Sequence, residues 1–174
     1  MDEAVMDGEM VAWLAKVLLR DLDSVRSQLE AYPDEDAIWQ TPPGMTNSAG
    51  TLALHIAGNL QHFIGAKLGG SGYVRDRRAE FELRGVSRTE MVSELDRASA
   101  AVEQALRTLP DHQLETDFPE AFGELQLTTG QYLVHLTTHL SYHVGQLDYH
   151  RRAVTGAPSI PGMVSLPALS DQGS

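Results

Sequence analysis

Residues 131–150 read QYLVHLTTHLSYHVGQLDYH, and this stretch decides the fold that the chain predicts. Its apolar residues fall on nearly every side of a helical wheel, which is typical of a helix inside a bundle rather than on its surface. Three histidines, His135, His139 and His143, follow one another at intervals of four and therefore share one face of this helix. A row of imidazoles inside a helical bundle predicts a metal site.

The helix of residues 131–150 cannot complete that site alone. A helix rises about 1.5 Å per residue, so His135 and His143 stand roughly 12 Å apart, too far for two bonds of about 2 Å to one ion. The site therefore needs one neighbouring pair of histidines and a ligand from another helix. His55, in NSAGTLALHIAGNLQHF (residues 47–63), is the natural third ligand, since its segment is otherwise apolar. A hydrogen-bonded core histidine is the alternative for His55.

Two further polar residues share a helical face with His55. Asn59 lies four residues and His62 seven residues beyond it, so both are predicted to line the same pocket as cofactor-binding or substrate contacts. A structural or surface role is the alternative for His62. Near the end of the last helix, Asp148 and Arg151 are predicted to form a surface ion pair.

A basic run, Arg75-Asp76-Arg77-Arg78, follows the second predicted helix. The simpler interpretation is a solvated or salt-bridged loop. The alternative is a rim of arginines that binds an anionic substrate in an otherwise acidic protein.

The composition limits the chemistry that is open to the chain. It has 174 residues, enough for one domain with a sizeable core, and no cysteine, which excludes disulfides and thiolate ligands. With 13 Lys and Arg against 24 Asp and Glu, the formal charge is −11, so we expect neither nucleic acid nor a membrane as a partner. The acidic start and the lack of a long apolar run predict a cytoplasmic location.

Helical periodicity, together with proline, glycine and capping signals, predicts an all-α protein, a four-helix bundle. The predicted helices span about residues 10–32, 49–68, 89–108 and 128–154. Capping boxes are predicted at Ser87-Arg88-Thr89-Glu90 and at Thr128-Thr129-Gly130-Gln131, and a short extended piece at 118–127. Residues 1–157 are predicted to form the bundle domain, and residues 158–174 a proline-rich C-terminal tail, either an arm or a disordered end.

Three segments together resemble the DinB/YfiT-like superfamily of metal-dependent proteins. They are NSAGTLALHIAGNLQHFIG, GG followed by RDRRAEF, and THLSYHVGQLDYHRR, and the resemblance extends to about Val154. It implies that His55, His139 and His143 bind a divalent metal, Zn or Ni, and it leaves His135 outside the triad. The chain departs from the family's pattern at Val144, where many members carry arginine.

The resemblance also implies an activity. Members of this family act as S-transferases or isomerases that use a low-molecular-weight thiol, bacillithiol or mycothiol, and others are described as hydrolases. We therefore expect a metal-dependent S-transferase or hydrolase acting on a small molecule. The alternative is a non-catalytic metal- or ligand-binding bundle, in either case as a homodimer. No residue is assigned as the general base, and His135 and His150 have no assigned role.

Overall fold

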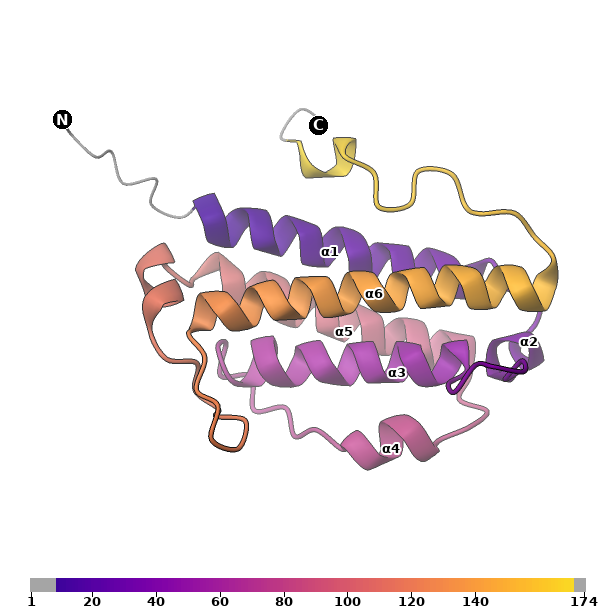
Figure 1. Cartoon of the computed structure of the whole chain (residues 1–174), viewed down its shortest axis with the longest axis horizontal. Helices are drawn as coiled ribbons and strands as arrows, with labels where there is room; N and C mark the ends of the chain where they lie inside the picture. Colours follow the sequence, from indigo (N-terminus) through magenta and orange to yellow (C-terminus); the bar gives the residue numbers. More distant parts are fainter. Residues whose placement is uncertain (1–8, 171–174) are drawn as a thin grey trace.

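Four long helices lie side by side around the hydrophobic core of the computed structural model, which describes residues 9–170 (Figure 1). These helices are α1 (Glu9–Glu30), α3 (Ala49–Leu60), α5 (Arg88–Arg107) and α6 (Thr129–Thr155). Two short helices, α2 (Glu35–Trp39) and α4 (Arg77–Glu82), lie outside the four long ones. The all-α class predicted from the sequence is confirmed, with two short helices added to the four expected.

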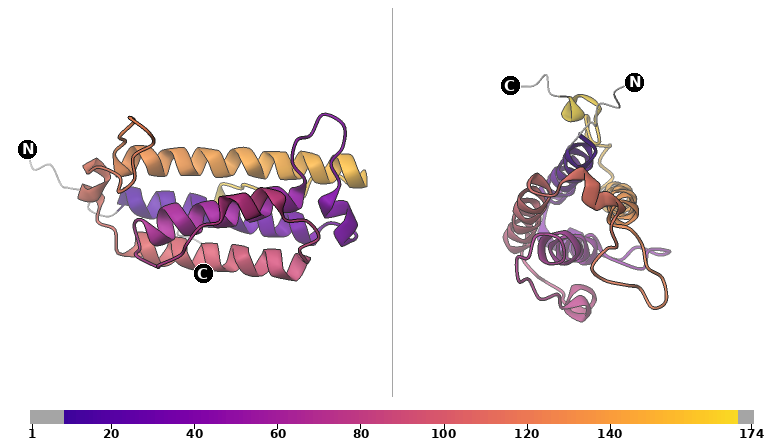
Figure 2. Two further views of the ribbon diagram at one scale, coloured as in Figure 1. Left: turned by 90° about the horizontal axis from the view of Figure 1, so that it is seen from below. Right: turned by 90° about the vertical axis from the view of Figure 1, so that its left-hand side faces the viewer.

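The long helices form a ring in the order α1, α5, α3, α6, which is visible end-on in Figure 2. Figure 1 shows that α1 and α6 run in one direction, whereas α3 and α5 run in the other. Because α3 and α6 are antiparallel neighbours, the start of α3 faces the end of α6. This pairing places His55 opposite the middle of α6.

Side-chain caps fix the starts of the helices that carry the histidines. Ser48 accepts a hydrogen bond from the backbone N–H of Thr51 at the start of α3. The two predicted capping boxes both form, at Ser87 for α5 and at Thr128 for α6. Helix α6 ends at Gly156, whose φ of 70° is the left-handed conformation that glycine adopts most easily.

The structure differs from the sequence prediction at four segments. The stretch RDRRAEF, predicted as a loop, contains α4, and the region before Ala49 contains α2. The second predicted helix is α-helical only to Leu60 and continues as a wider π-helical segment, Gln61–Ala66. The tail, predicted to lack helical structure, includes a 3-10 turn at Pro167–Leu169 that contacts α1. Residues 1–8 and 171–174 of the predicted domain and tail lie outside the described residues.

The predicted extended piece at 118–127 belongs to a small hairpin, residues 117–128. Two isolated bridges define it, one between Asp117 and Thr128 and one between Phe122 and Leu125. The hairpin precedes α6 and lies at the end of the bundle where α6 begins (Figure 2). None of the helices between residues 9 and 170 has the length and apolar character needed to cross a bilayer.

A buried polar seam joins α1 to α6. Ser141 donates a hydrogen bond to Asp21, a fully buried carboxylate, and the side chain of Gln28 contacts both Asp148 and Arg151. The predicted ion pair between Arg151 and Asp148 forms, at 3.5 Å, but Arg151 is only 2% exposed, so its predicted position at the surface is wrong. Its guanidinium is satisfied inside the protein by Gln28 and by the carbonyl of Pro158, which ties the tail to the bundle.

His150 belongs to the same seam and is buried. It donates from Nε2 to the carbonyl of Gln40 at 2.9 Å and accepts at Nδ1 from the hydroxyl of Tyr32 at 2.7 Å. Burial lowers the pKa of His150, although the hydrogen bond to Gln40 acts in the opposite direction. The folded protein therefore holds this imidazole in its neutral form.

We predict that the free energy of unfolding falls as the pH is lowered from about 7.5 to about 5. An unfolded histidine takes up its proton near pH 6.5, whereas folded His150 takes it up at lower pH, so acid favours the unfolded chain. Urea unfolding at the two pH values measures the loss. The variant His150→Gln should lose less stability on acidification than the wild type. The exposed control His112→Gln should behave as the wild type does, and equal pH dependence in all three proteins contradicts the prediction.

Candidate metal centre

Three imidazoles from two helices meet between α3 and α6. One ring nitrogen from each of His55, His139 and His143 lies within 4.8 Å of the other two. The Nε2 atoms of His139 and His143 are 3.0 Å apart, as their spacing of one helical turn predicts. The ring of His55 stands nearly perpendicular to both, with centroid distances of 5.3 and 5.2 Å. The structure thus brings together the three residues that the sequence selected.

Gln146 orients the His143 ring. Its Oε1 accepts a hydrogen bond from Nδ1 of His143 at 2.6 Å, one turn further along α6. With the proton on Nδ1, the lone pair of His143 lies on Nε2, the atom that faces His139. A metal-binding histidine characteristically donates its second N–H to such an acceptor, which fixes the tautomer and the ring plane.

Glu80 plays the corresponding part for His55. Its Oε2 lies 3.0 Å from Nδ1 of His55, and both side chains are buried. The carboxylate is held in turn by Arg75, whose Nε and Nη2 donate to its two oxygens at 2.6 and 2.8 Å. Because the charged Glu80 is an acceptor only, Nδ1 of His55 carries the proton and Nε2 is free for a metal.

The backbone of α3 makes room for Glu80 at Gly58. A methyl group on Gly58 would overlap Oε1 of Glu80 and lie 2.9 Å from its carboxyl carbon. Gly58 is one turn beyond His55 on the helix, so the carboxylate fits against the backbone beside the imidazole. A glycine at this position is what allows α4 to place its carboxylate on α3.

Burial favours the neutral form of the two imidazoles on α6. Burial lowers the pKa of His139 to about 4, with further lowering from His143, His55 and other neighbouring groups. Burial also lowers the pKa of His143, against the hydrogen bond to Gln146. For Glu80, burial favours a raised pKa, but the hydrogen bonds from Arg75 and His55 outweigh it and lower the pKa. His139 and His143 are thus held neutral and Glu80 is held ionised, and a neutral imidazole is the form that binds a metal.

The donor set fits a divalent transition metal. Two nitrogen ligands of one tetrahedral zinc ion lie about 3.4 Å apart. The three histidine nitrogens already lie within 4.8 Å of one another, so movements of their side chains on the order of 1 Å would bring them to that separation. Imidazole suits Zn and Ni alike, and three histidines leave at least one coordination position without a protein ligand. The cluster contains no carboxylate ligand among residues 9–170, since Glu80 contacts His55 on its far side.

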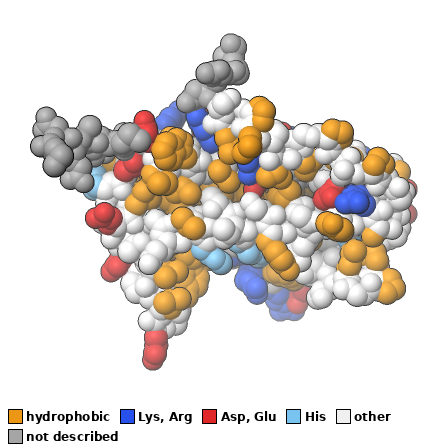
Figure 3. All heavy atoms as spheres, turned by 45° about the horizontal axis from the view of Figure 1, so that its top comes forward, with side chains coloured by type: hydrophobic (Ala, Val, Ile, Leu, Met, Phe, Trp, Pro, Cys, Tyr) orange, Lys and Arg blue, Asp and Glu red, His pale blue; other side chains and the backbone are white. Residues whose placement is uncertain are grey.

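A cavity of about 520 Å³, here called the histidine cavity, opens beside the cluster. Figure 3 shows histidine side chains at the surface between hydrophobic side chains and next to a group of basic ones. Asn59 and His62 both line this cavity, as predicted from their helical face, and so does His135. The other lining residues are His55, Phe63, Arg75, Arg77, Glu120, Phe122, Tyr132 and His139.

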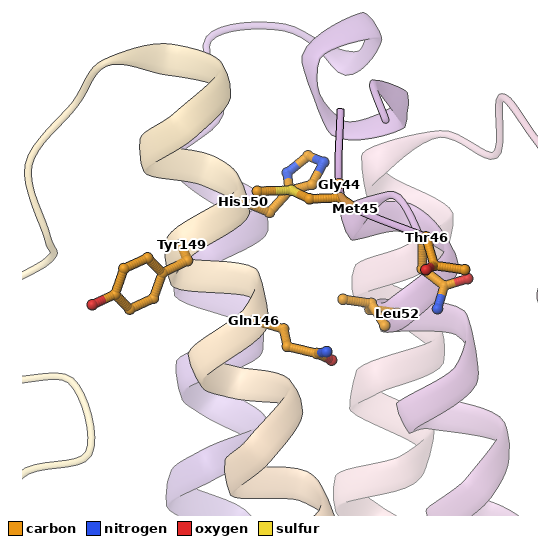
Figure 4. Close-up of a pocket in the computed structure, with 8 residues that line it drawn as sticks. Gly44, Met45, Thr46, Leu52, Gln146, Tyr149 and His150 are labelled. Atoms are coloured by element: carbon orange, nitrogen blue, oxygen red, sulfur yellow. The ribbon is translucent and has the colours of Figure 1, made fainter. Parts of the chain in front are cut away.

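A second cavity of about 420 Å³ lies further along α6, next to Gln146, Tyr149 and His150. Figure 4 shows the Gln146 side chain reaching from α6 toward Leu52 of α3, while Tyr149 points away. Gln146 therefore contacts His143 and also lines the second cavity.

The fold and the cluster define a class: a helical protein with a buried three-histidine group able to hold a metal ion. The model of the DinB superfamily matches residues 18–147, a span that includes all three histidines, and the chain belongs to this superfamily. The resemblance found in the sequence is confirmed. A comparison with curated proteins finds no match.

Sequence reasoning missed Glu80 and the positioning role of Arg75. Both lie in RDRRAEF, which was interpreted as a loop of charged residues. The signal that was present is the capping residue Asp76, whose side chain accepts from the N–H of Ala79 and starts α4. This capping residue indicates that the segment is ordered. It does not indicate that the carboxylate of Glu80 contacts His55, 25 residues earlier in the chain.

We predict that Gly58→Ala weakens zinc binding without removing a ligand. The added methyl displaces the Glu80 carboxylate from His55, and loss of such a supporting contact typically weakens metal binding by about 10- to 100-fold. Competition with a chromophoric chelator measures the affinity. Gly145→Ala is the matched control, because a methyl there meets no atom within 4 Å. Equal zinc affinity in the two variants would show that Glu80 does not support the site.

Proposed function

We propose that the protein is a divalent-metal-dependent enzyme that acts on a small electrophilic molecule in the histidine cavity, as an S-transferase or a hydrolase. His55, His139 and His143 hold the metal, with zinc or nickel as the proposed ion. The observation that carries the proposal is the pair of hydrogen bonds that Glu80 and Gln146 accept from Nδ1 of His55 and of His143. These bonds leave Nε2 of both imidazoles free to bind the ion.

The chemistry proposed follows from the donor set. A divalent cation with three imidazole ligands acts as a Lewis acid and lowers the pKa of a water or thiol that it binds. The protein residues hold that ion beside the histidine cavity, and its volume of about 520 Å³ lies within the range of small-molecule sites. A low-molecular-weight thiol is the proposed co-substrate in the transferase case.

The residues around the metal centre orient groups rather than transfer protons. Arg75 occupies both oxygens of Glu80, and His55 occupies one of them as well, so this carboxylate is committed to holding the imidazole. His62 Nε2 contacts Glu120 at 3.3 Å, whereas the buried Nδ1 of His62 and the buried Oδ1 of Asn59 have no hydrogen-bond partner among the described residues. We propose His62 and Asn59 as contacts to the bound substrate or cofactor.

A non-catalytic module is the second candidate, and one observation favours it. His135 lines the same cavity, and its ring stacks on His139 at a centroid distance of 5.7 Å. If His135 turned to bind the ion as a fourth ligand, the metal would have no open position and would serve a structural role.

Metal content tests the proposal. We expect about one equivalent of zinc or nickel in protein purified without an affinity tag, and loss of that metal in His55→Ala, His139→Ala and His143→Ala. Elemental analysis gives the stoichiometry, and circular dichroism confirms that each variant is folded.

Two histidine variants serve as controls. His112→Ala removes an exposed imidazole outside the cluster, and His135→Ala removes one that lines the cavity without belonging to the triad. Both should retain the metal. Loss of metal in His135→Ala would favour the saturated, non-catalytic site. Wild-type protein that binds neither zinc nor nickel on addition would overturn the proposal.

A further inference from the structure

The charges around the histidine cavity do not balance. Arg75 is neutralised by Glu80 at 2.6 Å, and Glu120 is paired with Lys67 at 2.8 Å. Arg77 also lines the cavity, but no carboxylate lies within ion-pair distance of it among residues 9–170. The guanidinium of Arg77, an exposed side chain, is therefore left without an ion pair at the cavity, in a chain whose formal charge is −11.

An aromatic ring places that guanidinium close to the cluster. The Cζ of Arg77 lies 5.0 Å from the centre of the Phe81 ring, and the same ring packs against His55 at a centroid distance of 5.0 Å. One ring therefore contacts both the guanidinium and an imidazole of the cluster. The stacking orients the guanidinium without using its N–H groups, which stay available for a ligand.

Three aromatic rings form one wall of the cavity. Tyr132 packs on Phe122 in a stacked arrangement with centroids 5.0 Å apart, and Phe63 packs against Tyr132 at 5.1 Å. All three rings line the cavity, and Phe122 is 38% exposed. An exposed ring face in a small-molecule cavity is a surface for a flat apolar group.

We propose that the histidine cavity binds a small organic anion with a flat apolar body, whose anionic group is bound by Arg77 and whose body lies against Phe63, Phe122 and Tyr132. This inference deepens the proposed function by naming the class of substrate. A guanidinium matches the two oxygens of a carboxylate, so an aromatic carboxylate is the simplest member of the class.

Benzoate is the probe for this site, with benzamide and acetate as its two partial analogues. Benzamide keeps the ring but lacks the charge, and acetate keeps the charge but lacks the ring. Titration calorimetry on wild-type protein, with its metal content measured on the same sample, should show benzoate binding more tightly than either analogue. Benzoate that binds no better than benzamide or acetate overturns the proposal.

Variants with matched controls locate the binding. Arg77→Gln should weaken benzoate binding by about tenfold or more, the loss expected for one charge-assisted contact, while benzamide binding is unchanged. Arg78→Gln removes the same charge from the next residue, which is exposed and paired with Glu82 outside the cavity, and should leave benzoate binding as in the wild type. Equal effects of the two variants would show a general charge effect and overturn the assignment to Arg77.

The aromatic wall is tested in the same way. Phe122→Ala should weaken benzoate binding but not acetate binding. Leu125→Ala changes an exposed residue of the same hairpin that does not line the cavity, and it should have no effect. Equal benzoate affinity in the two variants would overturn the proposal that the ring of the ligand lies against the aromatic residues of the cavity.

The metal measurement separates the two proposals. If the wild type holds metal but benzoate binds independently of Arg77, the substrate class is wrong and the metal-dependent function stands. If no metal binds but benzoate binding still depends on Arg77, the anion site stands and the metal-dependent function fails. Arg77→Gln should itself retain the wild-type metal content, because Arg77 is not one of the three histidines whose nitrogens come together in the cluster.

Discussion

The hydrogen bond from His55 to Glu80 is the contact on which the arrangement of the site depends. It joins α3 to α4, and it decides which nitrogen of His55 faces the other two imidazoles. A carboxylate as buried as Glu80 is costly unless its charge is compensated, and Arg75 provides that compensation through two hydrogen bonds. The short helix α4 thus gains its place in the structure from the same contact that orients the histidine.

This contact also explains why the segment between α3 and α5 is ordered. Glu80, within α4, is held against α3 by His55, and Arg75, just before α4, is held by Glu80. Arg77, between them, is thereby brought to the rim of the histidine cavity while its own guanidinium makes no ion pair in the described chain. One buried network therefore positions both the imidazole of His55 and the cavity's unpaired positive charge.

Much of this arrangement follows from sequence periodicity. The spacing of four put His135, His139 and His143 on one face of α6, and the family resemblance selected His139 and His143 from that row. His55 was a candidate because an imidazole in an apolar helix needs a partner. The same periodicity put Asn59 and His62 on the side that lines the histidine cavity. The long helices and their capping boxes were predictable because those signals depend only on neighbouring residues.

The remaining features depend on contacts between distant segments. Helix α4 has 6 residues, fewer than two turns, too few to show an apolar period. The burial of Arg151 depends on Gln28, 123 residues away, and on a carbonyl of the tail, neither of which marks the residue as internal in the sequence. Such polar groups can be buried because the fold brings their hydrogen-bond partners next to them.

The polar side chains of α6 are accommodated differently on its two sides. On the side toward α1, Ser141, Asp148 and Arg151 make hydrogen bonds that fix the rotation and the axial position of the helix. On the side toward α3, His139 and His143 are half-buried and held neutral by burial. Hydrogen-bonded polar groups specify geometry more closely than apolar contacts, which are non-directional.

The polar contacts between α6 and α1 therefore help to position the histidine cluster without touching it. A helix apolar on nearly every side has many similar packings available, whereas one tied at Asp21, Gln28 and Tyr32 has its rotation determined along much of its length. That rotation decides whether the imidazoles of α6 point at His55. The polar residues that never touch the metal centre therefore set the alignment that a three-histidine site requires.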